Sequence, residues 1–312
     1  MKVKIGVVIV TYNRLDKLKK TLELFDKQTF LPNYIVVVDN ASTDGTELFL
    51  KDWVVVSRKY DKNVIRMQEN TGGSGGFYEG LKYAQNRTAE WIWVSDDDAF
   101  PDIDALERAN EFFNIHSKLL DSIAAICGMV INGNKIDLLH RRSMKQKGLR
   151  VKTYISQEQD YKKEFFELNC FSYVGTIINK SKLKEAGLTN KEYFLWWDDT
   201  EHSLRLSKTG LIYCVPSIKI YHNVGMSNEG FTWKLYYNFR NYTDLCRKHF
   251  SMLSYKRYCF ITILKTYVKD LLWINKQKNK MIRDAIRDAQ NGKFGIDEVY
   301  TPTWKSNDNK CN

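Results

Sequence analysis

Residues 4–14 read Lys-Ile-Gly-Val-Val-Ile-Val-Thr-Tyr-Asn-Arg, an apolar, β-branched run that ends abruptly in polar side chains. Such a run is typical of a parallel strand that is buried on both faces of a sheet. Apolar side chains then recur at helical spacing between residues 15 and 25, and residues 34–38 and 91–94 repeat the apolar strand pattern. Because strands and helices alternate over the first hundred residues, the sequence predicts an α/β fold with a mostly parallel central sheet.

The composition is that of a globular protein. The chain has 312 residues, of which 43% are hydrophobic and 27% are charged, with a formal net charge of +11. These values exclude the collagen-like, disordered and disulfide-scaffold classes. The six cysteines form no CxxC pair, which favours a reducing compartment over a zinc site or a disulfide framework. No apolar run is long enough for a signal peptide or a membrane span, so we expect a cytoplasmic protein.

The chain changes character near residue 231. Between residues 233 and 290, thirteen Lys or Arg stand against four acidic residues, with eleven aromatic residues interleaved at largely helical spacing. We therefore expect a first domain at 1–230 and a basic, aromatic-rich helical extension at 231–312. Three interpretations of the extension stay open: peripheral contact of 233–290 with the inner face of the plasma membrane, a cap that packs on the first domain, or contacts in a homo-oligomer.

The sharpest chemical signal is Asp96-Asp97-Asp98, at the end of the strand predicted at 91–94. Adjacent carboxylates repel one another unless a cation lies among them. Alternate residues of an extended chain point the same way, so Asp96 and Asp98 can converge on Mg²⁺ or Mn²⁺, which also bind substrate phosphates. His222, just after the last predicted strand, is a candidate third ligand. The alternatives are acids that favour a helix N-terminus and a structural histidine.

Polar residues also follow the first two predicted strands, where open parallel sheets bind ligands. Thr11-Tyr12-Asn13-Arg14 follows the first strand and Asp39 the second. Tyr12 offers a face for stacking, and Asp39 either accepts a hydrogen bond from a base or only shapes the turn. The glycine-rich segment 70–76 (Asn-Thr-Gly-Gly-Ser-Gly-Gly) lets the backbone approach a phosphate, although it matches neither the dinucleotide fingerprint nor a P-loop.

The second constellation is Trp196-Trp197-Asp198-Asp199-Thr200-Glu201. Paired indoles offer an apolar platform of the kind on which sugar rings pack. Paired carboxylates can supply a general base whose pKa is raised by burial and by the neighbouring charge. The alternative is a pair of core tryptophans followed by helix-capping acids. Between the two constellations, the polar and basic residues 140–163 are predicted to form an excursion or mobile loop.

Taken together and in this order, these motifs resemble those of family 2 glycosyltransferases, which are inverting and have the Rossmann-like GT-A fold. The resemblance runs from Lys4 to about Gly230 and rests on TYNR, VDNASTDGT, NTGGSGG, SDDDA, WWDDTE and YHNVG. The NTGGSGGF, WVSDDD and WWDDTE forms are especially similar to the galactofuranosyl- and rhamnosyl-transferring branch. One departure is that many members have Glu-Asp where this chain has Asp198-Asp199.

The resemblance implies a role for each matching residue. The donor, a UDP-linked sugar, would be held by Thr11, Tyr12, Asp39 and Asn70, together with Asn13, Arg14, Gly72, Gly73 and Asp97. Asp96, Asp98 and His222 would hold Mn²⁺ or Mg²⁺. Asp199 would be the general base, Asp198 and Glu201 would orient the acceptor hydroxyls, and Trp196 and Trp197 would bind the acceptor. Tyr236-Tyr237 and Arg240-Asn241 are further candidates for the diphosphate site.

The function implied is transfer of galactofuranose or rhamnose to a glycan or lipid-linked acceptor in bacterial surface polysaccharide synthesis, such as that of a capsule or cell wall. Two alternatives come from other classes. A nucleic-acid-binding protein would fit the charge of +11, but the predicted strand-end cleft is acidic, so we expect no nucleic-acid partner. A sugar nucleotidyltransferase would carry a basic glycine loop after the first strand, where this chain has Thr-Tyr-Asn-Arg.

Overall fold

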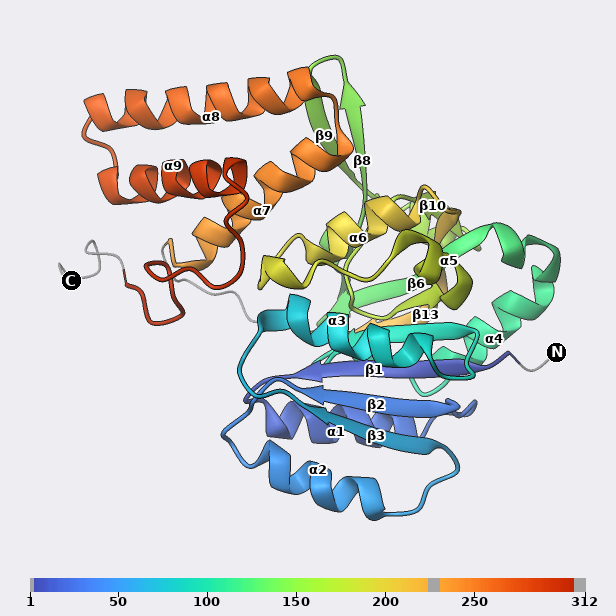
Figure 1. Cartoon of the computed structure of the whole chain (residues 1–312). Coiled ribbons are helices and arrows are strands. Elements are labelled where there is room, and N and C mark those ends of the chain that lie inside the picture. The colour runs from blue at the N-terminus through green and yellow to red at the C-terminus, as the bar shows by residue number, and fades with distance from the viewer. Residues whose placement is uncertain (1–2, 224–230, 306–312) are drawn as a thin grey trace.

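The fold is built around a twisted, mixed β-sheet (Figure 1). The computed structural model describes residues 3–223 and 231–305. The main strand path runs β10-β13-β6-β12-β4-β1-β2-β3. Its strands are β1 (Ile5–Thr11), β2 (Tyr34–Asp39), β3 (Asp61–Arg66), β4 (Trp91–Asp96), β6 (Ile123–Asn132), β10 (Phe166–Leu168), β12 (Thr176–Asn179) and β13 (Leu211–Tyr221). Two short strands, β5 (Phe100–Pro101) and β7 (Lys135–Ile136), extend β13 and β6.

Strands β1 to β4 pair in parallel, as predicted, and β6 pairs in parallel with β13. Strands β10 and β12 run antiparallel to their neighbours, which makes the sheet mixed. Residues 211–221 form the single strand β13, with a bulge between Val215 and Lys219. The α/β prediction is confirmed.

Helices cover both faces of the sheet. One face packs against α1 (Leu15–Asp26), α2 (Thr46–Val55) and α4 (Ala105–Ile115), and the other against α3 (Gly72–Gln85), α5 (Lys180–Ala186) and α6 (Asp198–Leu206). Strands β1, β2 and β4 are buried on both sides, which explains their continuous apolar sequence. Because β1 pairs in parallel with β2 and β4, the polar carboxyl ends of these strands meet at one edge of the sheet, outside the apolar core.

The segment predicted as a polar excursion or mobile loop at 140–163 is instead largely a β-hairpin. Strands β8 (Arg141–Lys147) and β9 (Arg150–Ile155) pair across a turn at Gly148, and β11 (Cys170–Phe171) completes a small second sheet. Most side chains of the hairpin are exposed, so they are mostly polar and do not alternate between apolar and polar residues. Without that alternation, nothing in the sequence signalled strands here.

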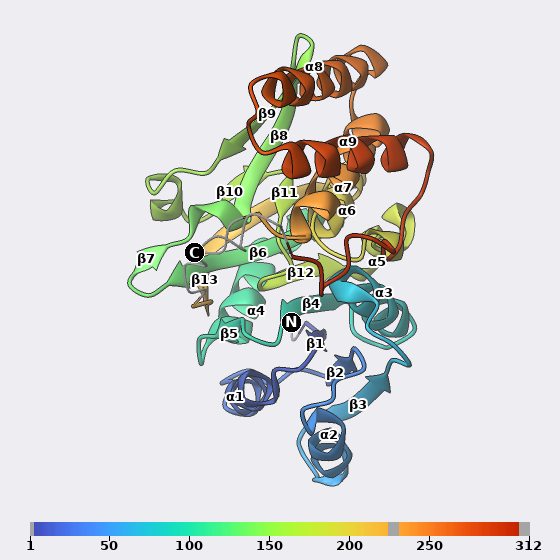
Figure 2. The ribbon, with the colours of Figure 1, turned by 90° about the vertical axis from the view of Figure 1, so that its left-hand side faces the viewer.

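The C-terminal extension contains α7 (Lys234–His249), α8 (Met252–Leu271) and α9 (Lys276–Gln290). Figures 1 and 2 show them gathered at one end of the molecule, with α9 packed on both α7 and α8. Within the described residues, no helix is long and apolar enough to cross a membrane. The five cysteines of the described ranges are free and buried, and Cys311 lies outside those ranges.

Candidate active site

The acids that follow β4 lie at the mouth of a cavity of about 700 Å³. Asp96 and Asp98 line this cavity together with His222, as the sequence predicted. Burial, followed by the charges of Asp98 and Asp97, raises the pKa of Asp96 to about 7. Burial likewise raises the pKa of Asp97 to about 6 against the opposing hydrogen bond from Thr11. The cluster thus holds negative charge that the protein has only partly neutralised.

Cations of the chain neutralise Asp98. Its carboxylate lies 2.9 Å from Arg14 Nη1, 2.8 Å from Lys17 Nζ and 3.3 Å from His222 Nε2. Although burial opposes the effect, these partners hold the pKa of Asp98 well below its usual value. Asp96 forms no ion pair within the described part of the chain.

The predicted metal triad is therefore not assembled as a chelate. Among the described residues, no group of three or more His, Cys, Asp or Glu is arranged to hold a metal ion. The physical reason is that Asp98 is turned to Arg14, Lys17 and His222. Val224 and Gly225, which complete the YHNVG motif, lie outside the described residues.

A smaller cavity of about 280 Å³ adjoins the acids and shares Arg14, Gly73 and Asp96 with the larger one. Predicted donor-site residues line it: Thr11, Tyr12, Arg14, Asn70, Gly72, Gly73 and Asp97. Tyr12 is 41% exposed, so one face of its ring is available for stacking. Asn13 does not line the cavity, because its side chain accepts a hydrogen bond from the amide of Thr43 at 2.6 Å.

Asp39 is placed differently from the expectation that it meets a base. It is fully buried, and its carboxylate accepts the amide of Ser42 at 3.0 Å and pairs with Arg66. It does not line the smaller cavity, and it shapes the turn after β2. Its neighbour Asn40, which the sequence analysis placed in the motif after the second strand without giving it a role, lines the cavity, and its amide nitrogen donates to Asn70 Oδ1 and to the carbonyl of Gly72.

The glycine-rich segment leads directly into α3, whose first turn begins at Gly72. Gly72 has φ +72°, and a Cβ there would lie 1.9 Å from the carbonyl oxygen of Phe194. That carbonyl also accepts the amide of Ser74 at 3.4 Å. Glycine is therefore required at 72 because the start of α3 touches the backbone ahead of α6.

The backbone ahead of α6 is strained. Phe194, Trp196 and Trp197 have φ of +64°, +65° and +68°, values that residues other than glycine rarely adopt. Both tryptophans line the large cavity, but they do not form one flat platform. Trp196 is 45% exposed, whereas Trp197 packs against Tyr242 and donates to Asn238 at 2.6 Å.

Helix α7 holds this strained loop in place. Asn241 Nδ2 donates to the carbonyls of Tyr193, Leu195 and Trp196 at 2.8–3.0 Å. Arg240 donates to the carbonyl of Tyr193 at 3.1 Å and is almost fully buried. The expectation that Arg240-Asn241 reaches a diphosphate is therefore wrong, because both side chains donate hydrogen bonds to backbone carbonyls. Tyr236-Tyr237 is likewise buried in the extension's core.

Asp198 and Asp199 open α6 and line the cavity. Burial and then the charge of Asp199 raise the pKa of Asp198 well above its usual value. Burial also raises the pKa of Asp199, but Arg142 and the hydroxyl and amide of Thr200 oppose that rise. The negative charge of the pair therefore resides chiefly on Asp199. Such a carboxylate can accept a proton near neutral pH.

The sequence analysis also missed Arg142 of β8. Its guanidinium lines the cavity, donates to Thr200 Oγ1 at 3.0 Å and lies 5.8 Å from the ring centre of Trp197. The signal was hidden because we expected an excursion or mobile loop at this position. The hairpin brings it, with His140, to the same cavity as the acids of α6.

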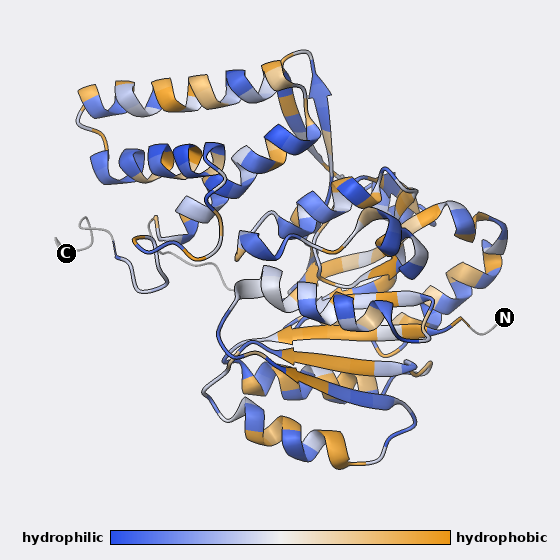
Figure 3. Ribbon diagram, in the orientation of Figure 1, coloured by the Kyte–Doolittle hydropathy of each residue, from blue (hydrophilic) through white to orange (hydrophobic). Residues whose placement is uncertain are grey.

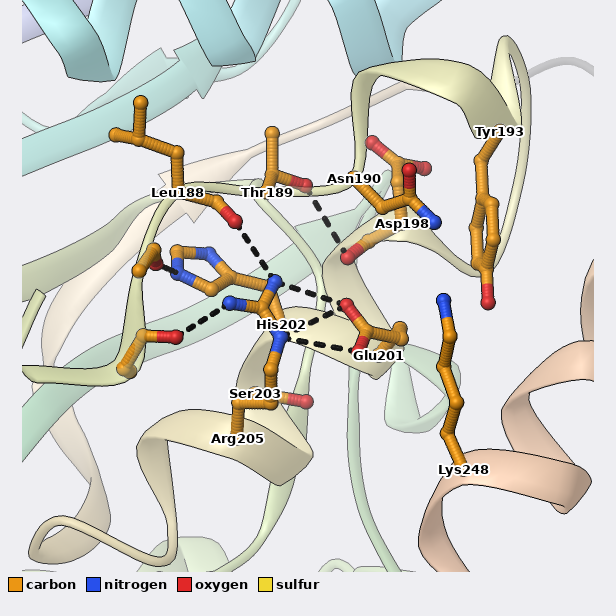
Figure 4. Close-up of polar contacts among 12 residues, drawn as sticks. Leu188, Thr189, Asn190, Tyr193, Asp198, Glu201, His202, Ser203, Arg205 and Lys248 are labelled. Atoms are coloured by element: carbon orange, nitrogen blue, oxygen red, sulfur yellow. Dashed lines mark hydrogen bonds and ion pairs between the residues drawn. The ribbon is translucent and has the colours of Figure 1, made fainter. Parts of the chain in front are cut away.

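Glu201 was predicted to orient an acceptor, but it does not line the cavity. It is 3% exposed and pairs with Arg205 at 2.9 Å (Figure 4). It also pairs with His249 at 3.1 Å. Although burial opposes the effect, His249 and Arg205 lower the pKa of Glu201 to about 2. Arg205 also donates to the carbonyls of Ala186 and Leu188, so Glu201 fixes α6 to the preceding loop and to α7.

His202, the next residue of α6, gives a pH-dependent prediction. Its Nε2 donates to the carbonyl of Gly187 at 2.9 Å, so Nδ1 accepts from the Tyr173 hydroxyl at 2.6 Å. Burial and then Arg205 lower the pKa of His202 to about 3. Between about pH 6.5 and pH 3, His202 is protonated in the unfolded chain but stays neutral in the folded chain. Its contribution to the free energy of unfolding is therefore complete above pH 6.5 and is lost as the pH falls toward 3.

We expect His202 to lower the free energy of unfolding by about 1 kcal/mol for each pH unit below about 6.5. Urea unfolding of the unmodified chain and of His202→Gln at several pH values measures this. The difference between the two curves should shrink steadily from pH 7 to pH 4. Parallel curves would show that His202 is not held neutral.

A sequence model described as Glycosyl transferase family 2 matches residues 6–187, more than half of the chain. The chain belongs to this family. The resemblance seen in the motifs is thereby confirmed, and membership favours glycosyl transfer over the nucleotidyltransferase and nucleic-acid-binding alternatives.

Two curated relatives of this glycosyltransferase family 2 chain act on furanose or deoxy sugars, according to their names. Galactofuranosyltransferase GlfT1 of Mycobacterium tuberculosis is 26% identical over 206 residues, 65% of this chain and 64% of the relative. The dTDP-rhamnosyl transferase RfbF of Shigella flexneri is 29% identical over 295 residues, 90% of this chain and 92% of the relative. The chain thus spans just under two thirds of GlfT1, and the predicted galactofuranosyl and rhamnosyl branch is confirmed.

Solved structures of similar fold support the GT-A assignment. GalNAc-T7 with UDP, GalNAc and Mn²⁺ has a TM-score of 0.64 at 15% identity, covering 93% of this chain and 56% of that one. S. aureus TarS 1–349 with UDP-GlcNAc has a TM-score of 0.59 at 15% identity, covering 92% and 80%. The mannosyltransferase PcManGT from Pyrobaculum calidifontis, with GDP-Man and Mn²⁺, has a TM-score of 0.55 at 15% identity, covering 94% and 87%. At these identities the likeness concerns the fold.

Proposed function

We propose that the chain is an inverting, cation-dependent glycosyltransferase that moves galactofuranose or rhamnose from a nucleoside diphosphate to a hydroxyl of a glycan or lipid-linked acceptor. One observation carries the proposal: a single cavity is lined by Asp96 and Asp98 after β4 and by Trp196, Asp198 and Asp199 at the start of α6. A leaving group held by the first set and a hydroxyl held by the second would share one space.

The nucleoside is proposed to occupy the smaller cavity beside Tyr12 and Asn70. Gly72 and Gly73 open α3 there, and the N-terminus of a helix favours a phosphate. Because this cavity shares Arg14 and Gly73 with the larger one, the diphosphate would bridge the two. The name of RfbF points to dTDP, and two solved structures of similar fold contain UDP or UDP-GlcNAc, so these are the donor nucleotides to compare; we favour UDP.

A divalent cation would bind between the acids and a diphosphate if Asp98 exchanged Arg14 and Lys17 for the ion. Asp96 is partly exposed to the cavity and has no ion pair within the described residues, and burial, followed by the charges of Asp98 and Asp97, raises its pKa to about 7. A cation beside it would favour its charged form. His222 Nδ1 is buried and makes no hydrogen bond in the described part of the chain. We propose that Asp96, Asp98 and His222 hold Mn²⁺ or Mg²⁺, which when bound neutralises charge on the leaving diphosphate.

The proposed reaction is one displacement. Asp199 accepts the proton of the acceptor hydroxyl while that oxygen bonds to the anomeric carbon of the donor. The bond from that carbon to the diphosphate oxygen breaks on the opposite face, so the configuration inverts without a covalent enzyme intermediate. Asp198, whose charged form is disfavoured by burial and by the charge of Asp199, can hydrogen-bond the acceptor, and Trp196 offers its exposed ring to the sugar.

Binding of nucleotides tests the donor site directly. We expect UDP-galactofuranose or dTDP-rhamnose to raise the melting temperature with Mn²⁺ and to lose that effect with EDTA, because ligands that bind only the folded chain stabilise it. At a ligand concentration of about 100 Kd the stabilisation is about 3 kcal/mol. The better ligand then enters turnover assays, in which release of nucleoside diphosphate rather than pyrophosphate identifies glycosyl transfer.

Asp96→Asn should remove the Mn²⁺-dependent part of the shift, whereas Asp121→Asn, a change at an exposed acid away from the cavity, should not. Absence of stabilisation by any nucleotide sugar, with Mn²⁺ or with EDTA, would contradict the proposed function.

A further inference from the structure

Helix α8 exposes an apolar face. Leu253, Phe260, Leu264, Tyr267, Val268 and Leu271 recur at intervals of three, four and seven residues, so they share one side of the helix. Phe260 is 68% exposed and Leu271 is 80% exposed. In Figure 3, orange residues recur along α8 among blue ones. We call these six side chains the α8 ridge.

The α8 ridge is not needed for the core of the extension. Tyr255, Cys259 and Thr266, on the other side of α8, are the residues that are buried. Their neighbours in the core come mainly from α7 and α9, which Figures 1 and 2 place beneath α8. A contiguous exposed apolar row on a helix about 30 Å long marks an interaction site rather than a scatter of surface residues.

Basic side chains flank the α8 ridge. Residues 245–269 contain no Asp or Glu. Lys256, Arg257, Lys265 and Lys269 lie on α8, and none forms an ion pair with another described residue. The loop after α8 adds Trp273, which is 81% exposed and lies under Lys276 Nζ at 3.5 Å from its ring centre. The surface therefore combines apolar, aromatic and cationic groups, and the one acid within residues 245–273, Asp270, is paired with Arg283 at 2.7 Å.

The β8–β9 hairpin adds to the same end of the molecule. Gln146 donates to Ser251 Oγ at 3.0 Å and accepts the amide of Ser251 at 2.9 Å, which fixes the hairpin to the start of α8. Its turn carries exposed Leu149 between Lys147 and Arg150. Figures 1 and 2 both show the tip of the hairpin beside the first turns of α8.

We propose that the α8 ridge and the β8–β9 tip dock the protein on an anionic lipid bilayer. Apolar side chains would enter the interface, Tyr267 and Trp273 would sit at headgroup depth, and the lysines and arginines would reach the phosphates. A second copy of this chain fits less well, because symmetric pairing of α8 would bring one set of unpaired cations against another. The proposal goes beyond glycosyl transfer and does not depend on it.

Flotation of the full chain with vesicles tests the proposal. We expect binding to phosphatidylcholine vesicles that contain phosphatidylglycerol, and little binding to phosphatidylcholine alone. Phe260→Ser with Leu264→Ser should weaken binding at least tenfold, as should Lys256→Glu with Arg257→Glu. Matched controls are Leu48→Ser with Ile115→Ser, at 69% and 71% exposure, and Lys59→Glu with Lys118→Glu.

Any of the following results would overturn the proposal of an anionic-membrane site. Absence of binding by the unmodified chain, equal binding to both kinds of vesicle, or equal loss in the control variants would exclude the α8 ridge as an anionic-membrane site. Light scattering coupled to size exclusion tests the second copy: a dimer that becomes a monomer in Phe260→Ser with Leu264→Ser, without vesicle binding, would assign the ridge to self-association. Retained thermal stability in all variants shows that folding is intact, and no nucleotide sugar is needed.

Discussion

Asp199→Asn should lower kcat by about 10³-fold while leaving the donor-induced rise in melting temperature unchanged. The amide cannot accept the hydroxyl proton, and loss of a general base typically costs 10²–10⁴-fold, about this amount. The donor is proposed to contact residues after β1, β3 and β4 rather than α6, so its binding should persist. Single-turnover assays with the best donor and acceptor, beside thermal shifts, give both quantities.

Asp198→Asn is the matched control. Burial and the charge of Asp199 raise the pKa of Asp198 well above its usual value and so disfavour its charged form, and an amide of the same shape replaces it closely. We expect kcat to fall by about tenfold or less, because the change alters only one hydrogen bond to the acceptor. Retained turnover in Asp199→Asn, or an equal loss in both variants, would remove Asp199 as the base.

Gly72→Ala should lower the free energy of unfolding by about 3 kcal/mol and abolish donor binding. At φ +72° an added Cβ costs about 1–2 kcal/mol, and its approach to within 1.9 Å of the Phe194 carbonyl oxygen forces a shift that costs about as much again. The shift would displace the start of α3 from the loop ahead of α6. Urea unfolding and nucleotide-dependent thermal shifts measure the two effects.

Gly73→Ala controls for the change of residue type. Position 73 lies in the same turn of α3, but a Cβ there meets nothing within 4 Å. We expect its stability to stay within about 1 kcal/mol of the unmodified chain, since alanine favours the helix over glycine. If both variants unfolded alike, the close approach to Phe194 would not be the reason for glycine at 72.

Much of the first half could be predicted from sequence. Apolar strands that stop at polar residues, as at Thr11 and Asp96, determine where a parallel sheet opens to solvent, and such patterns depend on neighbouring residues alone. Asp96, Asp98 and His222, each at or just after a predicted strand, line one cavity together with Trp196 and Asp199, whose roles the motif resemblance implied.

The remaining differences depend on contacts distant in sequence. Asp39 is drawn from the cavity by Arg66 on the next strand, and Glu201 by His249 of α7. Arg142 reaches the cavity only because β8 pairs with β9. A motif shows which residue types occur together, but it does not show which partner each side chain will find.

The support that α7 gives to the loop at 193–197 limits how acceptor specificity can be exchanged between relatives. A swap of the tryptophan loop alone would transplant a strained backbone and leave behind Asn238, Asn241 and Asp244, whose side chains bond to Trp197, to the loop carbonyls and to Tyr193. The smallest transferable unit therefore includes both the loop and α7. A chimera joined near residue 231 would mismatch the two, and one joined after His249 would keep them together.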